Sequence, residues 1–248
     1  MTEANGLKTE LRFLSGVPWA EIHRAMQASF ADYAIDMSYM TEHFLELRSR
    51  KNGVDLAVSP GLFAGGELVG FTLVGLGPRR GEPAAFDSAT GLVRAWRGQG
   101  WASALFAHAL PALRKRGVKV FVLEVLQGNQ AAIRAYKKSG FRIVRELDCF
   151  DLRPQGPLAA APPPAGITIE RAGSEVLPTF EREAGWPLSW ECSFDAQRRS
   201  GRDVAIWVAQ TGGDPVGMVA FHTALSWLMA CQVRPAWRRR GVASALLR

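Results

Sequence analysis

The sequence predicts a mixed α/β fold that occurs twice, with a complete first unit and an incomplete second one. Segments whose apolar residues recur at helical spacing alternate with short apolar segments that are typical of strands. A stretch rich in proline and alanine, RPQGPLAAAPPPAG at 153–166, interrupts this pattern and is typical of a linker. The pattern A-W-R-x-x-G-x-A-S-A-L starts at Ala95 and again at Ala236. We therefore expect a domain at 1–152, a linker at 153–166 and a second unit at 167–248.

In the first unit, helices and strands are expected to alternate along the chain. Gly65-Gly66 marks a turn between two strands, and Asn129 and Gly140 can cap the start and the end of the last helix. The segment 118–125 is apolar nearly throughout, which predicts a strand buried on both faces. Pro111 is expected to kink its helix. Strands are expected at 10–14, 54–58, 67–76, 84–93, 118–125 and 141–152, and helices at 18–33, 38–51, 100–116 and 129–139.

The second unit begins in the same order but stops early. Strands are expected at 167–171, 204–210, 215–222 and 225–233, and helices at 175–183 and 190–199. The repeated pattern then begins a helix, but only ten residues follow Arg238, whereas the first unit continues from Arg97 to Leu152. A shortened chain, a degenerate half-domain and a half that another chain completes all fit this pattern. The exposed edge of a half-sheet would favour association, such as a homodimer.

Composition limits the classes of function. No apolar run approaches the roughly 18 residues that span a bilayer. The N-terminus, MTEANGLKTE, lacks the apolar core of a signal peptide, so we expect a cytoplasmic protein with no membrane partner. The three cysteines, Cys149, Cys192 and Cys231, are widely spaced and the four histidines are scattered, which predicts neither disulfides nor a metal site. The net charge of +7 favours an anionic partner such as nucleic acid, acidic lipid or a phosphorylated cofactor.

The segment 97–102, RGQGWA, lies between a predicted strand and a predicted helix and is a candidate anion cradle. The first amides of a helix have no partner within the helix, and the helix dipole adds positive potential there. Gly98 and Gly100 allow the backbone to approach an anion closely. Arg94 and Arg97 are expected to add countercharge. A plain turn is the alternative, and the segment matches neither the P-loop nor the dinucleotide-binding pattern.

A second motif follows the next predicted strand. Together the two motifs resemble the GNAT superfamily, the GCN5-related N-acetyltransferases. The family's pyrophosphate pattern, [RQ]-x-x-G-x-[GA], is matched by Arg97, Gly100 and Ala102, in that order. Its downstream pattern, N-x-x-A-x-x-x-Y-x-x-x-G-F, is matched with every spacing kept by Asn129, Ala132, Tyr136, Gly140 and Phe141. The resemblance covers most of 8–152 and part of 167–248, and it implies the GNAT acyl-CoA N-acyltransferase fold in duplicate.

The resemblance also implies a mechanism, in which an amine attacks the thioester carbonyl of acetyl-CoA directly. Backbone N–H groups near Leu92 and Val93 would polarise the carbonyl. Tyr136 would protonate the departing thiolate, although a core aromatic residue at helical spacing is the alternative interpretation. Contacts with the cofactor are implied for Leu92, Val93, Arg97, Gly98, Gln99, Gly100, Trp101, Ala102, Ser103, Asn129, Ala132 and Tyr136.

Three candidates remain for the general base. Glu124 lies in an L-E-V segment similar to the one that supplies the base in the ribosomal-protein N-terminal acetyltransferase branch. A solvent-facing carboxylate at the end of a strand is the alternative for this residue. Asp87 is the reserve candidate, and a water relay would need no protein base at all. One departure is Arg94, which stands where the family often has proline and where the second copy keeps Pro235.

Two other classes of function compete with an N-acetyltransferase. The first is a non-catalytic acyl-CoA-binding or dimerisation protein of the same fold. The second is nucleic-acid binding, which the net charge and the WRRR segment at 237–240 suggest, although no nucleic-acid module is recognisable. We expect the acceptor to be a small-molecule or peptide amine. The resemblance places its site around 30–47, where Asp32, Tyr33, Asp36 and Glu42 could attract a cation.

Overall fold

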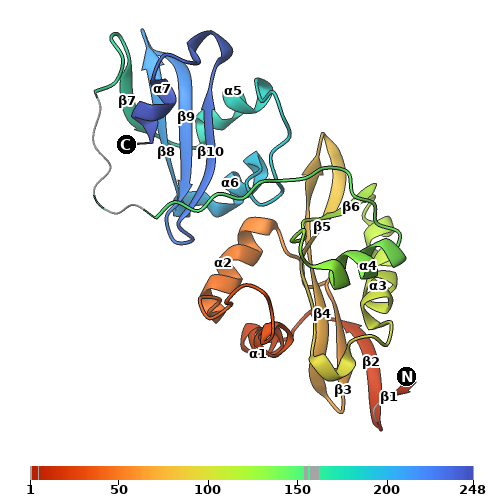
Figure 1. Ribbon diagram of the computed structural model, residues 1–248. Helices are drawn as coiled ribbons and strands as arrows, with labels where there is room; N and C mark the ends of the chain where they lie inside the picture. Colours follow the sequence, from red (N-terminus) through yellow and green to blue (C-terminus); the bar gives the residue numbers. More distant parts are fainter. Residues whose placement is uncertain (1, 5, 154–155, 157–161, 248) are drawn as a thin grey trace. The chain divides into compact units, whose positions relative to one another are not determined.

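A computed structural model describes residues 2–4, 6–153, 156 and 162–247 of the chain (Figure 1). The chain divides into two compact units, Met1–Val144 and Arg145–Arg248, and each is described by itself. Half of the linker predicted at 153–166, residues 154, 155 and 157–161, lies outside the described residues. No helix in the described part of the chain combines the length and the apolar character that a membrane span requires.

The first unit is built on a six-stranded sheet with the order β1-β2-β3-β4-β5-β6. Neighbouring strands are antiparallel from β1 to β5, and β6 runs parallel to β5. The strands are β1 (Thr2–Ala4), β2 (Leu7–Phe13), β3 (Pro60–Ala64), β4 (Glu67–Arg79), β5 (Glu82–Leu92) and β6 (Val120–Leu123). The helices are α1 (Trp19–Phe30), α2 (Glu42–Asn52), α3 (Trp101–Lys115) and α4 (Gln130–Lys138).

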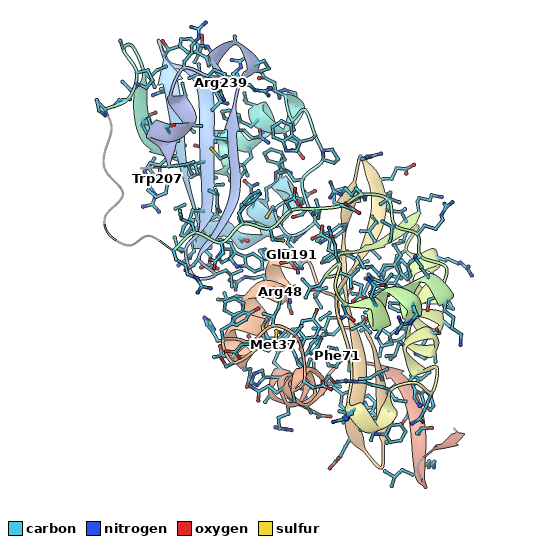
Figure 2. All side chains as sticks on the ribbon, viewed as in Figure 1. Met37, Arg48, Phe71, Glu191, Trp207 and Arg239 are labelled. Carbon is cyan, nitrogen blue, oxygen red and sulfur yellow. The ribbon has the colours of Figure 1, made fainter. Side chains whose placement is uncertain are left out.

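Helices cover the two faces of this sheet separately (Figure 1). On one face, α1 and α2 pack over Phe71 and Leu73 of β4, and Phe71 is labelled in Figure 2. On the other face, Ala109 of α3 packs on Val74 and Ala85. The helix α3 continues through Pro111 to Lys115.

The strands β5 and β6 pair over only four residues, from Ala84 opposite Val120 to Asp87 opposite Leu123. The strand β5 then continues to Leu92, whereas the chain after Leu123 leaves the sheet and enters α4. The sheet therefore opens along the second half of β5.

The structure corrects three predicted strands. The segment 54–58 is a turn, because the Asp55 side chain accepts a hydrogen bond from the Ala57 amide at 2.8 Å and the Asp55 carbonyl accepts one from Val58 at 3.1 Å. The strand lies next to it instead, at Pro60–Ala64, where all five residues are buried. The segment 118–125 is not buried on both faces, because β6 is short and forms an edge of the sheet, with Val120 41% exposed.

The strand predicted at 141–152 is also wrong. This segment has no assigned helix or strand, and the Phe150 side chain is 94% exposed. Its backbone forms no described ladder, and the Arg145 side chain donates to the carbonyls of Pro187 at 2.6 Å and Leu188 at 2.9 Å. Apolar residues that favour a strand are not sufficient to make one where no partner strand pairs with them.

The second unit repeats the first part of this arrangement. Its sheet has the order β10-β9-β8-β7 with all neighbours antiparallel, and α5 and α6 pack on one face while α7 packs on the other. The helix predicted at 190–199 begins only at Phe194, after the cap residue Ser193. The elements are β7 (Thr168–Ala172), α5 (Leu177–Arg182), α6 (Phe194–Ser200), β8 (Val204–Thr211), β9 (Asp214–His222), β10 (Trp227–Val233) and α7 (Val242–Leu246).

Candidate active site

The glycine-containing loop leads from β5 into the first turn of α3. Gly98 and Gly100 have φ angles of 75° and 86°, in the left-handed region that favours glycine. The first helical hydrogen bond of α3 is donated by the Ala104 amide to the Gly100 carbonyl at 3.1 Å. The amides of Gln99, Gly100, Trp101 and Ala102 precede this bond, so they stay available to an anion at the start of a long helix.

The Arg97 side chain does not supply the expected countercharge. Its guanidinium forms a two-point ion pair with Asp32, at 2.7 and 2.8 Å, and this contact holds the pKa of Asp32 below its usual range. The same side chain donates to the carbonyl of Ser29 at 2.8 Å and of Leu92 at 3.0 Å. Because these bonds use both terminal nitrogens and Nε, Arg97 fixes the end of α1 against the loop and is not directed at a ligand.

Only one of the two predicted carbonyl donors is oriented toward the opening. The Val93 amide donates to the Val69 carbonyl at 2.9 Å, so the expectation that it faces a ligand is wrong. Leu92 lies opposite Gly70 in the same ladder. Because hydrogen-bonded and non-bonded pairs alternate along antiparallel strands, the Leu92 amide points away from β4 and toward the open side of β5.

A buried polar cluster lies where β5 and β6 separate. Asp87 is 5% exposed, and its Oδ2 accepts a hydrogen bond from Thr90 Oγ1 at 2.8 Å. Thr90 Oγ1 is in turn 2.9 Å from Thr72 Oγ1 on β4. The phenol of Tyr136, which α4 carries, lies near enough to the Asp87 carboxyl for each group to shift the pKa of the other. Two strands and one helix therefore bring a carboxyl group, a phenol and two hydroxyls together.

Burial sets the protonation of this cluster. Loss of solvent raises the pKa of Asp87 to about 7, although the hydrogen bond from Thr90, the neighbouring Tyr136 phenol and the charge of Arg48 oppose the rise. Burial, followed by the charge of Asp87, raises the pKa of Tyr136 well above its usual range. The phenol ring packs against Phe106 and Phe141, with ring centroids 5.8 Å away in both cases.

The other residues of the downstream motif hold α4 in place. The Asn129 side chain accepts a hydrogen bond from the Ala132 amide at 3.0 Å and so caps the helix. Ser103 Oγ of α3 lies 2.9 Å from Ser139 Oγ, at the end of α4. These contacts connect the anion cradle to the helix that carries Tyr136.

Glu124 lies directly after β6, one residue beyond Leu123, which pairs with Asp87. Its side chain is exposed, so it avoids the cost that burial imposes on a carboxylate. Sequence reasoning found Glu124 and Asp87 but missed Thr72, Thr90 and Ser139. Threonine and serine are common in strands and at helix ends, so only their spatial convergence marks them. No group of three or more metal-ligating side chains gathers in the described part of the chain.

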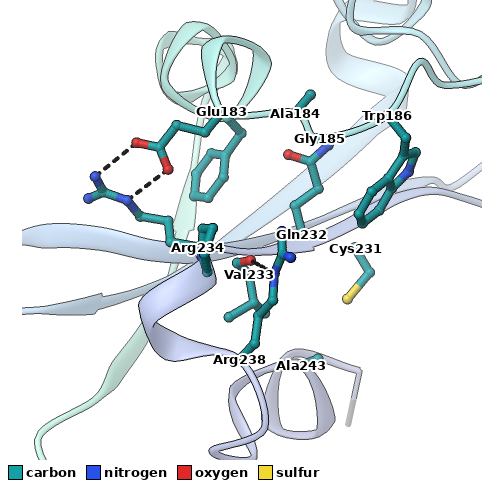
Figure 3. Close-up of a pocket in the computed structure, with 12 residues that line it drawn as sticks. Glu183, Ala184, Gly185, Trp186, Cys231, Gln232, Val233, Arg234, Arg238 and Ala243 are labelled. Carbon is teal, nitrogen blue, oxygen red and sulfur yellow. Dashed lines mark hydrogen bonds and ion pairs between the residues drawn. The ribbon is translucent and has the colours of Figure 1, made fainter.

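The second unit has a similar loop without the polar cluster. Gly241 keeps a positive φ of 83°, and Arg238 Nε donates to the Val233 carbonyl at 3.0 Å, as Arg97 does to Leu92. A small pocket beside this loop is lined by Trp186, Cys231 and Arg238, with Glu183 paired to Arg234 (Figure 3). All three tyrosines of the chain, at 33, 39 and 136, belong to the first unit, so this loop has no counterpart of Tyr136.

Comparison with known proteins identifies the family. A family model described as "Acetyltransferase (GNAT) family" matches residues 19–141 and again 172–248. A GCN5-related N-acetyltransferase from Sphaerobacter thermophilus is similar over 99% of this chain and 82% of its own, with 19% identity and a TM-score of 0.66. The ribosomal-protein-S18-alanine N-acetyltransferase from Escherichia coli is 20% identical over 56% of this chain and 80% of its own, with a TM-score of 0.45. An aminoglycoside acetyltransferase from an uncultured soil metagenomic sample is 13% identical over 60% of this chain and 97% of its own, with a TM-score of 0.46.

A search of curated proteins found no match. The family model nevertheless covers most of the chain, and the duplicated mixed α/β fold and the two loops agree with it. Acetyl-CoA is therefore the cosubstrate. The chain belongs to the acetyltransferase (GNAT) family, whose model it matches twice.

Proposed function

We propose that the first unit transfers the acetyl group of acetyl-CoA to a primary amine, by direct attack of the amine on the thioester. The observation that carries this proposal is the position of Tyr136, which lies beside the opening between β5 and β6 on a helix that Ser139 connects to the start of α3. A phenol placed there can reach the sulfur of a thioester whose pyrophosphate lies at the cradle. If Tyr136 were only a core aromatic residue, neither the opening between β5 and β6 nor the free amides at the start of α3 would be needed beside it.

The backbone supplies the groups that bind and polarise. The amides from Gln99 to Ala102 hold the pyrophosphate, at the N-terminus of a helix whose dipole favours negative charge. The Leu92 amide donates to the thioester carbonyl and stabilises the oxyanion that forms on attack. Because these donors are backbone groups in a fixed strand and helix, they require no reorganisation during the reaction.

Side chains manage the protons. The amine nitrogen forms a bond to the carbonyl carbon and loses a proton to Glu124 or to a water relay. The carbon–sulfur bond then breaks, and the phenol of Tyr136 protonates the departing thiolate. Glu124 is the stronger candidate for the base because its side chain is exposed, directly after β6, and can exchange protons with solvent.

The acceptor is proposed only as a class. Two of the acidic residues at 30–47 are already engaged: Asp32 pairs with Arg97, and Asp36 accepts hydrogen bonds from the backbone and the hydroxyl of Ser38, at 2.9 and 2.8 Å. An amine therefore has to be recognised largely by shape and by groups other than these two carboxylates.

A turnover screen with acetyl-CoA tests the proposal. Peptide N-termini, polyamines, aminoglycosides and amino acids are offered as acceptors, and free thiol is measured. We expect at least one class to be acetylated, and Y136F to lower kcat about a hundredfold or more while the Kd for CoA stays within about twofold, because a general acid contributes about 10² to 10⁴. Tight CoA binding with no turnover of any class would instead support a non-catalytic acyl-CoA-binding or dimerisation protein.

A further inference from the structure

We propose that Asp87 is the proton donor behind Tyr136: a buried neutral carboxyl group that passes its proton to the phenol oxygen while the phenol protonates the thiolate. This inference rests on the proposed acetyltransferase function. It assigns Asp87 to the departure of the thiol and not to the activation of the amine.

The contacts around Asp87 suit a neutral acid better than a carboxylate. Its Oδ2 accepts a hydrogen bond from Thr90, and its Oδ1 accepts none from any described residue. A buried carboxylate normally accepts several hydrogen bonds or pairs with a cation. The groups that act on Asp87 are Tyr136 on α4 and Arg48 on α2, and Arg48 is the smallest of the influences. Tyr33, beyond the end of α1, acts on Tyr136.

Tyr136 on its own is a poor acid for this reaction. Its surroundings move its pKa upward, whereas a thiol titrates at about 8.5, so transfer from an isolated phenol to the thiolate is uphill. A carboxyl group with a pKa of about 7 reverses the balance. Net transfer from Asp87 to a thiolate is then favourable by about 1.5 pKa units, or about 30-fold.

The two transfers balance in a single step. The phenol O–H bond breaks as the S–H bond forms on the leaving thiol, and the carboxyl O–H bond breaks as a new O–H bond forms on the phenol oxygen. Tyr136 ends neutral and Asp87 ends as a carboxylate, which regains a proton from solvent after the products leave. The proton that the amine loses follows a separate route, through Glu124 or water.

The direction in which kcat changes with pH distinguishes Asp87 as a proton donor from Asp87 as a general base. A proton donor must be protonated, so kcat should fall as the pH rises through about 7. A general base must be ionised, so kcat would rise over the same range. Asp87 was also a candidate for the base on the sequence alone, and the sign of this limb decides between the two roles.

The experiment measures kcat from about pH 5.5 to about pH 9, a range that brackets the Asp87 pKa of about 7. It compares the native full chain with D87N, and E82Q is the matched control. The asparagine side chain has the size of aspartate but no acidic proton, and Glu82 is an exposed carboxylate on the same strand. We expect a descending limb near pH 7 in the native protein and in E82Q. In D87N we expect kcat at about pH 6 to drop about tenfold or more and the limb to disappear, while the Kd for CoA stays within about twofold.

Two results would overturn the inference. One is a rising limb near pH 7 that D87N removes, which identifies a base. The other is a D87N protein that keeps both its rate and its descending limb. Both results require a native protein that acetylates an amine, so they are distinguishable from failure of the proposed function, in which the native protein turns over no acceptor at any pH.

Discussion

Folding favours the protonated form of the Asp87 carboxyl group, and this makes the stability of the protein depend on pH. Its pKa rises from 3.8 to about 7 on folding, so between these values the folded state binds more protons than the unfolded state. The free energy of unfolding therefore falls as the pH rises from about 4 to about 7 and is level above that range. The loss is at most about 4 kcal/mol, for a shift of this size in a fully buried group.

We expect D87N to remove this loss. Because asparagine does not ionise, the variant should be more stable than the native protein at about pH 8, and the difference should shrink toward about pH 5. Urea unfolding at the two pH values measures the effect, with E82Q as the control. Equal pH dependence in D87N and the native protein would mean that Asp87 ionises as readily in the folded state as in the unfolded chain.

The two glycines of the loop differ in what the second copy of the pattern puts in their place. Gly98 corresponds to Arg239, which has a φ of 62°, whereas Gly100 corresponds to Gly241, with a φ of 83°. A Cβ at either position in the first loop would meet no atom within 4 Å, so only the backbone conformation opposes a side chain.

We therefore expect G100R to destabilise the first unit by about 1–2 kcal/mol, the usual cost of a left-handed residue, and G98R to destabilise it less. The pair introduces the same side chain at two open positions, so the comparison isolates the backbone. Thermal unfolding of both variants measures the order. A larger loss for G98R would show that the second copy is a poor guide to the first.

At the scale of elements, α4 shows how a cap supports a functional side chain. The helix spans only Gln130–Lys138, and a helix this short is marginal without its cap and its packing. We expect N129A to destabilise the first unit by about 1 kcal/mol and to lower kcat, because the helix that carries Tyr136 frays. S193A removes the same type of cap from α6 in the second unit, with a 3.2 Å bond to the Ala196 amide, and should leave kcat unchanged. Equal kcat for N129A and S193A would contradict this role.

The elements also show which parts of the site could be predicted from the sequence. Asn129, Tyr136 and the loop glycines carry local signals, namely a cap, a spacing and a turn, and the structure places them on α4 and before α3. The Asp87–Thr90 pair carries no such signal, because residues three apart in a regular strand face opposite sides. A bulge at Ser88 brings them to one face, since Ala89 pairs with Leu73 and Asp87 with Val74.

Other errors came from tertiary context. The segment 141–152 contains several apolar residues that favour a strand, but these do not supply a partner strand. The sequence predicts a free Val93 amide because a sequence does not tell which amides a ladder uses. The sequence likewise predicts a free Arg97 charge, because Asp32 is distant along the chain and only the fold brings the two residues together.

At the scale of the whole chain, the two units share the loop but not the chemistry around it. The second unit contains no tyrosine, and its loop arginine, Arg238, lies over the Trp186 ring at 5.8 Å. We expect R238A to leave kcat and the KM for acetyl-CoA within about twofold of the native values, because the acid and the polar cluster are all in the first unit. Steady-state kinetics checks this, and a large fall in kcat for R238A would place part of the reaction in the second unit.

The bulge at Ser88 gives β5 an unusual tolerance to loss of a residue. A regular strand that loses one residue turns every side chain beyond the gap to the opposite face. Ser88 has no opposite residue on β4, so its deletion leaves Ala89 opposite Leu73 and Asp87 opposite Val74 in an unbroken ladder. The hydrogen bond from Asn52 to Ser88, at 2.8 Å, is lost, but the faces are kept. Deletion of Ser88 should therefore give a folded protein, whereas deletion of Ala85 from the same strand should not, and circular dichroism of the two shortened chains distinguishes them.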